Sequence, residues 1–120
     1  MNKKAFLICP VRGHTKEETE EIVDNLEKQG YLVHWPPRDT NQDDPTGLRI
    51  CQDNFQAIAE SQVVFIIWDG QSQGCLFDLG IAFALSKELK VISNPTLTEG
   101  KSFQNMMKDW QDNGLVRWNS

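Results

Sequence analysis

The stretch that decides the fold is SQVVFIIWDGQSQGCLFDLGIAFA, residues 61–84. Its first part, Ser61–Trp68, is a continuous apolar run rich in β-branched residues, which is typical of a central strand of a parallel sheet. The turn DGQSQG follows, and the apolar segment from Cys75 to Lys87 predicts a helix. We therefore expect a buried strand, a tight turn and a helix in succession.

Strands and helices also alternate on both sides of this stretch. The segment 14–30 carries Thr15 and Glu18 at capping-box spacing and ends at Gly30, which predicts an amphipathic helix. From Leu48 to Glu60, the residues Cys51, Phe55 and Ile58 recur with the spacing of one buried helical face. The other expected elements are strands at Lys4–Cys9, Tyr31–Trp35 and Lys90–Asn94, a helix at Ser102–Gln111, and a short terminal strand at Leu115–Trp118.

Strands that alternate with helices imply right-handed crossovers and a parallel sheet with helices on both faces. We predict one α/β domain over residues 1–120, a three-layer Rossmann-like or flavodoxin-like fold with four to five strands. The loop 36–47, PPRDTNQDDPTG, is longer than usual connections of this kind. Ligands of such sheets bind where the strands end, which here means after Cys9, Trp35 and Trp68.

Composition excludes several classes of function. The net charge is −5 and the basic residues are scattered, which argues against a protein that binds nucleic-acid backbones. Apolar runs are too short for a membrane span, and the N-terminus lacks the features of a signal peptide. The three cysteines form neither an even disulfide set nor a metal-binding spacing, so we expect free thiols and a cytoplasmic location.

Asp78 stands out, because no other charged residue lies between Cys75 and Ser86. On a helix it shares a face with Ile81, Ala82 and Leu85, and a buried carboxylate needs a compensating partner. In one interpretation, the free amides and the dipole of the helix start stabilise the anion. In the other, Asp78 faces a ligand pocket at the end of a strand.

Three segments carry a resemblance to a known family. The combination of FLICPVRG (6–13), PPRD (36–39) and SQGCLFDLGIAFA (72–84) is similar to the nucleoside 2-deoxyribosyltransferases, which include deoxynucleoside 5′-monophosphate N-glycosidases. The likeness extends from about Lys4 to Ile92, and its sharpest part is the pattern of Gly74, Phe77, Asp78, Leu79, Gly80 and Ala82.

The resemblance implies that Asp78 is the nucleophile. It would attack the anomeric carbon of a deoxyribosyl group and form a covalent glycosyl-enzyme, from which the sugar passes to water or to a second base. No cofactor and no metal are implied, and the partner is a nucleoside or nucleotide. The resemblance also implies a homo-oligomer in which a neighbouring chain completes the pocket.

The resemblance further implies a set of substrate-binding residues. The amides of Val11, Arg12 and Gly13, with the Arg12 side chain, would surround a 5′-phosphate. With the candidates that follow the second and third expected strands, such as Arg38, Asp39, Ser72 and Gln73, the predicted substrate-binding set is Pro10, Val11, Arg12, Gly13, Arg38, Asp39, Asn54, Asp69, Ser72, Gln73 and Gly74.

The sequence departs from the family at three positions. The family's usual nucleophile is Glu, one methylene longer than Asp78, and its two supporting acids fall on Asn54 and Ser72. Asp69 or Asp39 would have to replace one of these acids. These departures favour a second hypothesis, a nucleotide-binding or sensing domain without chemistry, and a flavodoxin-like electron carrier is a third.

Other candidate residues also have a purely structural interpretation. Cys75 at a helix start could be a thiol nucleophile, but no His lies nearby in the sequence, and packing is favoured. His34 is expected to be a packed or capped histidine. Trp35 and Trp68 could stack on a base or pack in the core, and PPRD could bind a ligand or form a surface salt bridge.

Overall fold

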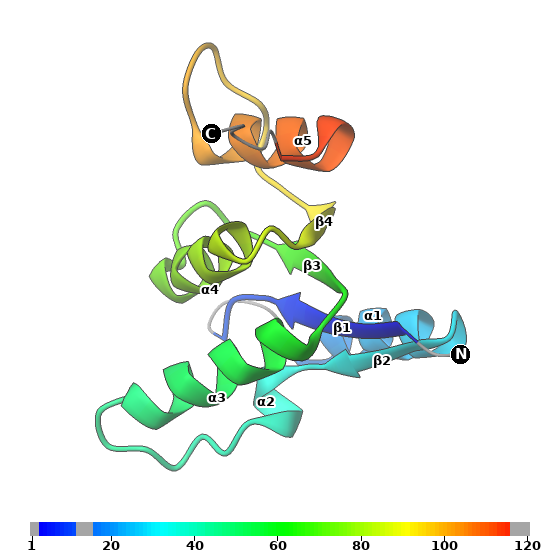
Figure 1. Ribbon diagram of the computed structural model, residues 1–120, viewed down its shortest axis with the longest axis vertical. Coiled ribbons are helices and arrows are strands. Elements are labelled where there is room, and N and C mark those ends of the chain that lie inside the picture. Colours follow the sequence, from blue (N-terminus) through cyan, green and yellow to red (C-terminus); the bar gives the residue numbers. More distant parts are fainter. Residues whose placement is uncertain (1–2, 12–15, 116–120) are drawn as a thin grey trace, which may run out of the picture.

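The computed structural model describes residues 3–11 and 16–115 and contains a four-stranded parallel sheet (Figure 1). The elements are β1 (Lys3–Ile8), α1 (Lys16–Lys28), β2 (Tyr31–His34), α2 (Pro36–Asp39), α3 (Leu48–Glu60), β3 (Val63–Ile67), α4 (Gln73–Ala84), β4 (Glu88–Ser93) and α5 (Phe103–Asn113). The expected strand at 115–118 lies almost wholly outside the described residues.

The strand order is β2-β1-β3-β4, and every pair is parallel. All five residues of β3 are buried, as its continuous apolar sequence predicts for a central strand. The chain leaves β1 toward β2 on one side and continues from β3 to β4 on the other. The two halves therefore diverge between β1 and β3, which is where sheets of this kind bind ligands.

Alternating side chains of the strands build two separate cores. On one face, Phe6, Val64 and Ile66 pack with residues of α3, α4 and α5. On the other face, Leu7 and Phe65 pack with residues of α1. The predicted three-layer α/β architecture is confirmed.

The β3–α4 turn is fixed by its own side chains. Asp69 Oδ1 accepts hydrogen bonds from the amides of Gln71 (2.9 Å) and Ser72 (2.8 Å). The Ser72 hydroxyl in turn accepts from the Cys75 amide at 3.3 Å and caps α4. Because of this cap, α4 begins at Gln73 and not at Cys75 as expected.

Some local expectations were wrong. Pro36 and Pro37 begin the short helix α2 instead of a loop, because proline fits the first helical positions, where no backbone N–H is needed. On α3, Phe55 is 45% exposed and Asn54 is buried in its place. Leu85, expected on the inner face of the following helix, ends it and is 40% exposed.

Candidate active-site cleft

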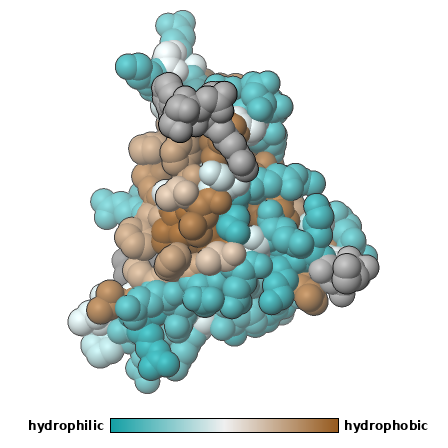
Figure 2. Space-filling view, viewed as in Figure 1, coloured by the Kyte–Doolittle hydropathy of each residue, from teal (hydrophilic) through white to brown (hydrophobic). Residues whose placement is uncertain are grey.

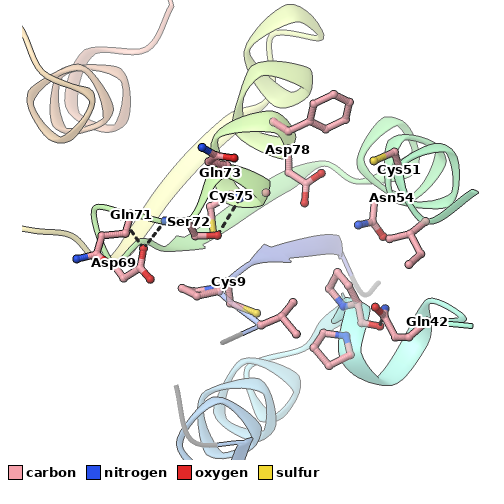
Figure 3. Close-up of a pocket in the computed structure, with 17 residues that line it drawn as sticks. Cys9, Gln42, Cys51, Asn54, Asp69, Gln71, Ser72, Gln73, Cys75 and Asp78 are labelled. Carbon is pink, nitrogen blue, oxygen red and sulfur yellow. Dashed lines mark hydrogen bonds between the residues drawn. The ribbon is translucent and has the colours of Figure 1, made fainter. Parts of the chain in front are cut away.

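A cleft of about 760 Å³ opens where β1 and β3 end, between α2, α3 and the start of α4 (Figure 3). One part of its wall is apolar and comes from α2 and α3 through Pro36, Pro37 and Ile50. The opposite part is polar and comes from the β3–α4 turn. The remaining lining residues are Cys9, Pro10, Val11, Gln42, Cys51, Asn54, Asp69, Gln71, Ser72, Gln73, Gly74, Cys75, Phe77 and Asp78.

Asp78 points its carboxylate into this cleft (Figure 3). It lies beyond the first turn of α4, and no described residue donates a hydrogen bond to it. Burial raises the pKa of Asp78 to about 7, because no hydrogen bond or charge from the described residues offsets the loss of water around the charged form. The interpretation in which free amides of the helix start hold the anion therefore does not fit.

Three thiols, those of Cys9, Cys51 and Cys75, line the same cleft. Burial raises the pKa of Cys9 to about 12 and that of Cys75 to about 11, and the nearby Asp78 charge contributes to both shifts. Cys9 and Cys75 are therefore neutral thiols near pH 7, and a neutral thiol is a poor nucleophile. These raised pKa values argue against Cys75 as the nucleophile of a cysteine hydrolase, as the sequence did.

Asn54 faces Asp78 across the cleft (Figure 3). Its side-chain oxygen Oδ1 accepts a hydrogen bond of 2.8 Å from the Thr40 hydroxyl. Thr40 itself is 5% exposed and lies at the end of α2. The amide nitrogen of Asn54 is left to face the cleft.

The structure brings together most of the residues predicted for the site. Seven described residues of the predicted set lie on the cleft wall around Asp78. They are Pro10, Val11, Asn54, Asp69, Ser72, Gln73 and Gly74. Arg12 and Gly13 lie outside the described residues.

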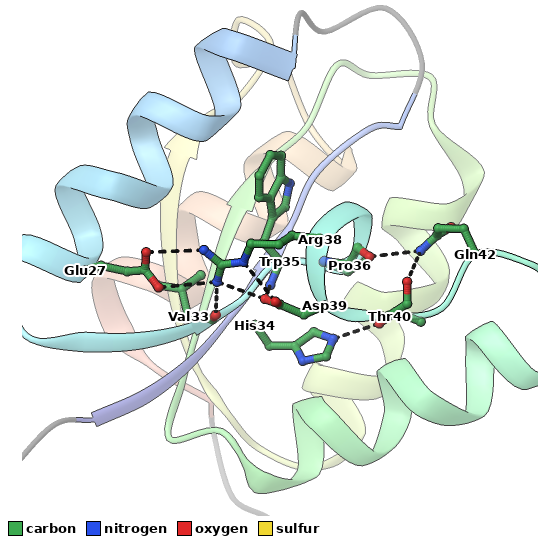
Figure 4. Close-up of polar contacts among 9 residues, drawn as sticks. All are labelled: Glu27, Val33, His34, Trp35, Pro36, Arg38, Asp39, Thr40 and Gln42. Carbon is green, nitrogen blue, oxygen red and sulfur yellow. Dashed lines mark hydrogen bonds and ion pairs between the residues drawn. The ribbon is translucent and has the colours of Figure 1, made fainter.

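Arg38 and Asp39 are not on the cleft wall. The Arg38 guanidinium contacts Asp39 at 2.9 Å and Glu27 at 3.3 Å, and it also donates to the Val33 carbonyl (Figure 4). Partial burial raises the pKa of Asp39, but the hydrogen bonds from Arg38 and from the Trp35 amide outweigh it and lower this pKa. The surface salt bridge left open by the sequence is the arrangement observed.

Trp35 and Trp68 pack in the core, with 3% and 6% of their surface exposed. Neither lines the cleft, so the stacking of a base on these two rings is not supported. Trp68 instead meets Phe103 edge to face, with ring centroids 6.1 Å apart.

Sequence reasoning missed Gln42, Cys51 and Thr40 at this site. Cys51 lies one helical turn from Asn54 on α3, so the helical spacing itself was a usable signal. Gln42 lines the cleft from the α2–α3 connection, and Thr40, which does not line it, contacts the lining residue Asn54. No local pattern reports that tertiary position.

Over residues 3–11 and 16–115, no helix is long and apolar enough to cross a membrane. Within the same ranges, no three His, Cys, Asp or Glu side chains lie close enough together to hold a metal ion.

Two solved structures have a similar fold. One is the CMP N-glycosidase BcmB from Clostridium botulinum, with 21% identity and a TM-score of 0.57 over 74% of this chain and 70% of that one. The other is a 2-deoxyribosyltransferase from Leishmania mexicana, with 18% identity and a TM-score of 0.61 over 98% of this chain and 91% of that one. No protein-family model and no curated protein matches the sequence. The chain thus has the fold of the nucleoside 2-deoxyribosyltransferase-like proteins, which its sequence predicted.

Proposed function

We propose that this protein cleaves or transfers the N-glycosidic bond of nucleosides, deoxynucleosides or their 5′-monophosphates, with Asp78 as the nucleophile. The observation that carries the proposal is the Asp78 carboxylate, which faces the cleft without a hydrogen bond from any described residue. A partly buried carboxylate with no hydrogen-bond donor among the described residues is a common place for a ligand to bind. The similarity to a CMP N-glycosidase and a 2-deoxyribosyltransferase supports the same chemistry.

The proposed reaction has two steps. An ionised Asp78 oxygen bonds to the anomeric carbon while the C–N bond breaks, and the electron pair of that bond leaves with the base. Water or a second base then displaces Asp78 from the sugar. A pKa near 7 leaves about half of Asp78 ionised at neutral pH, so the nucleophilic form is available.

The two ends of the cleft suit the two parts of a nucleoside. Pro36, Pro37 and Ile50 offer an apolar wall for a flat base. At the other end, Ser72, Gln73 and Gly74 offer polar groups to the sugar or to a 5′-phosphate. Arg12, which follows the lining residues Pro10 and Val11 in the chain, is the proposed anchor for that phosphate.

Asp69 is the proposed replacement for a supporting acid. It lies two residues after β3, on the cleft wall, and its Oδ1 accepts hydrogen bonds from the amides of Gln71 and Ser72. Ser72, which stands where the family has an acid, caps α4 instead.

The test is release of free base from a panel of deoxynucleosides and their 5′-monophosphates, with and without an added second base. Release in water alone indicates a hydrolase, and exchange that needs the second base indicates a transferase. Asp78→Asn is expected to reduce the rate on the order of 10³-fold or more. Asp109→Asn, an exposed change on α5, is the matched control and should leave the rate unchanged.

A non-catalytic nucleotide-binding domain is the second candidate. It is favoured by Asn54 and Ser72, which stand where the family has acids and are both held in structural hydrogen bonds. Nucleotide binding without base release across the panel, and with no change in Asp78→Asn, would select this candidate over the enzyme.

A further inference from the structure

Three side chains from successive elements form a hydrogen-bonded chain that ends at the cleft. His34, at the end of β2, has its Nε2 atom 2.8 Å from the Thr40 hydroxyl (Figure 4). Thr40 follows α2 and donates to Asn54 Oδ1 on α3, also at 2.8 Å. Both Thr40 and Asn54 are buried.

The direction of this chain is fixed by proton counting. A threonine hydroxyl has one proton, and Thr40 gives it to Asn54. The Thr40 oxygen must therefore accept from His34, so the Nε2 atom of His34 carries a proton. Burial lowers the pKa of His34, which keeps the ring neutral at pH 7 with its proton on Nε2.

Neighbouring residues also hold the hydrogen-bonded His34 and Thr40 in place. The His34 ring stacks on Phe6, with ring centroids 5.4 Å apart and planes 9° from parallel. The Thr40 amide donates to the Pro36 carbonyl, and Gln42 donates to the carbonyls of both Pro36 and Thr40. The Thr40 hydroxyl therefore stays directed between His34 and Asn54.

These hydrogen bonds fix the orientation of the Asn54 side-chain amide. Because Oδ1 is held by Thr40, the two N–H groups of Nδ2 face the cleft opposite Asp78 (Figure 3). No described residue accepts a hydrogen bond from them. Without the Thr40 hydroxyl, the amide could turn over and present an oxygen acceptor in place of a donor.

We propose that His34 and Thr40 are positioning residues that hold the Asn54 amide as a hydrogen-bond donor toward the substrate. Asn54 then selects substrates that place an acceptor oxygen or nitrogen opposite it. This inference rests on the proposed function, because it takes the bound molecule to be a nucleoside or nucleotide.

The hydrogen-bonded chain itself is tested by the nitrogen NMR spectrum of the histidines, which needs no activity. His34, assigned by its loss in His34→Gln, is expected as the Nε2–H tautomer in the wild-type protein. In Thr40→Val, which lacks the hydroxyl, the tautomer preference should weaken. A Nδ1–H tautomer in the wild-type protein would reverse the chain and overturn the proposal.

Its effect on substrate is tested by base-release kinetics on deoxycytidine, deoxyuridine and their 5′-monophosphates. Asn54→Ala is expected to lower kcat/KM about 100-fold and Thr40→Val about tenfold. Thr40→Ser keeps the hydroxyl and should restore most of the activity. Thr96→Val, an exposed change in the loop between β4 and α5, is the matched control.

The outcomes separate this proposal from the proposed function. If Thr40→Val unfolds more readily but keeps wild-type kcat/KM, the chain is only structural and the inference is wrong. If the wild-type protein releases no base, the enzymatic proposal fails. The inference is then decided by the Asn54 side-chain amide signal on addition of the same four compounds. A shift that is lost in Thr40→Val supports it, and no shift overturns it.

Discussion

At the scale of single residues, Asp78 and Asp39 show how the surroundings of a carboxylate set its chemistry. Asp39 meets the Arg38 guanidinium and the Trp35 amide, and its pKa is lowered. Among the described residues none donates a hydrogen bond to Asp78, and burial raises its pKa to about 7. An ionised Asp78 therefore destabilises the folded protein, and the same group is ready to act on a ligand.

This destabilisation predicts a pH-dependent gain from Asp78→Asn. The folded-state pKa of Asp78 lies above the ordinary value of 3.8, so folding favours the protonated form. The contribution of Asp78 to stability is therefore greatest below about pH 4, falls as the pH rises to about 7, and is constant above that. Asp78→Asn cannot ionise and should be more stable than the wild-type protein at about pH 8, by roughly 2–4 kcal/mol.

Urea unfolding of both proteins at about pH 4 and pH 8 measures this difference. At the acidic pH, which is close to the ordinary pKa of 3.8 and where the folded Asp78 is neutral, the two free energies of unfolding should nearly coincide. An equal difference at both pH values would mean that the ionisation of Asp78 is not its cause.

At the scale of elements, the turn between β3 and α4 shapes the polar end of the cleft. Ser72 both caps α4 and lines the cleft, whereas Ser102 caps α5 away from it, accepting from the Asn105 amide at 3.1 Å. Ser72→Ala and Ser102→Ala should each lower the free energy of unfolding by about 1 kcal/mol. Only Ser72→Ala should also lower the rate of base release.

Chemical denaturation and the base-release assay, carried out on both variants, check this pair. Equal losses of activity would show that loss of a helix cap acts through general stability. The polar end of the cleft would then have no part in binding substrate.

The same elements show what a sequence can predict and what it cannot. The bounds of α3 follow from the sequence, because apolar spacing and the strand after it mark both ends. The inward position of Asn54 does not follow, since an apolar pattern favours Phe55 there. Only Thr40, 14 residues away in the chain, makes a buried amide acceptable.

The candidate site was predictable to a similar degree. Asp78 stood out as the charged residue of an apolar helix, and Asp69 and Ser72 belonged to the turn before it. Arg38 stood in an unusual loop as well, but its partners Glu27 and Val33 lie on other elements and draw it away from the cleft. Spacing along the chain carries no information on such competing partners.

At the scale of the whole molecule, α4 has apolar side chains that the rest of the domain leaves exposed. Cys75, Leu79 and Ala82 face the core, yet Phe77 is 54% exposed, and Phe83, whose ring meets Trp110 edge to face with centroids 5.5 Å apart, is still 51% exposed. Figure 2 shows a hydrophobic patch over this helix. A helix with apolar residues on all sides is usually buried. The exposed side of α4 is therefore a candidate surface for binding another protein chain.

We propose that this partner is a second copy of the chain, as the resemblance implied, because Phe77 joins the exposed face of α4 to the cleft. Sedimentation equilibrium should then show a dimer or larger oligomer. Phe83→Lys, which adds a charge to this helix, should shift the protein toward the monomer and lower its rate of base release.

Leu97→Lys is the matched control, since Leu97 is also 51% exposed but lies in the loop before α5. Circular dichroism identifies a variant that has merely unfolded. A wild-type protein that remains monomeric at every concentration, with full activity, would rule out a neighbouring chain as part of the site.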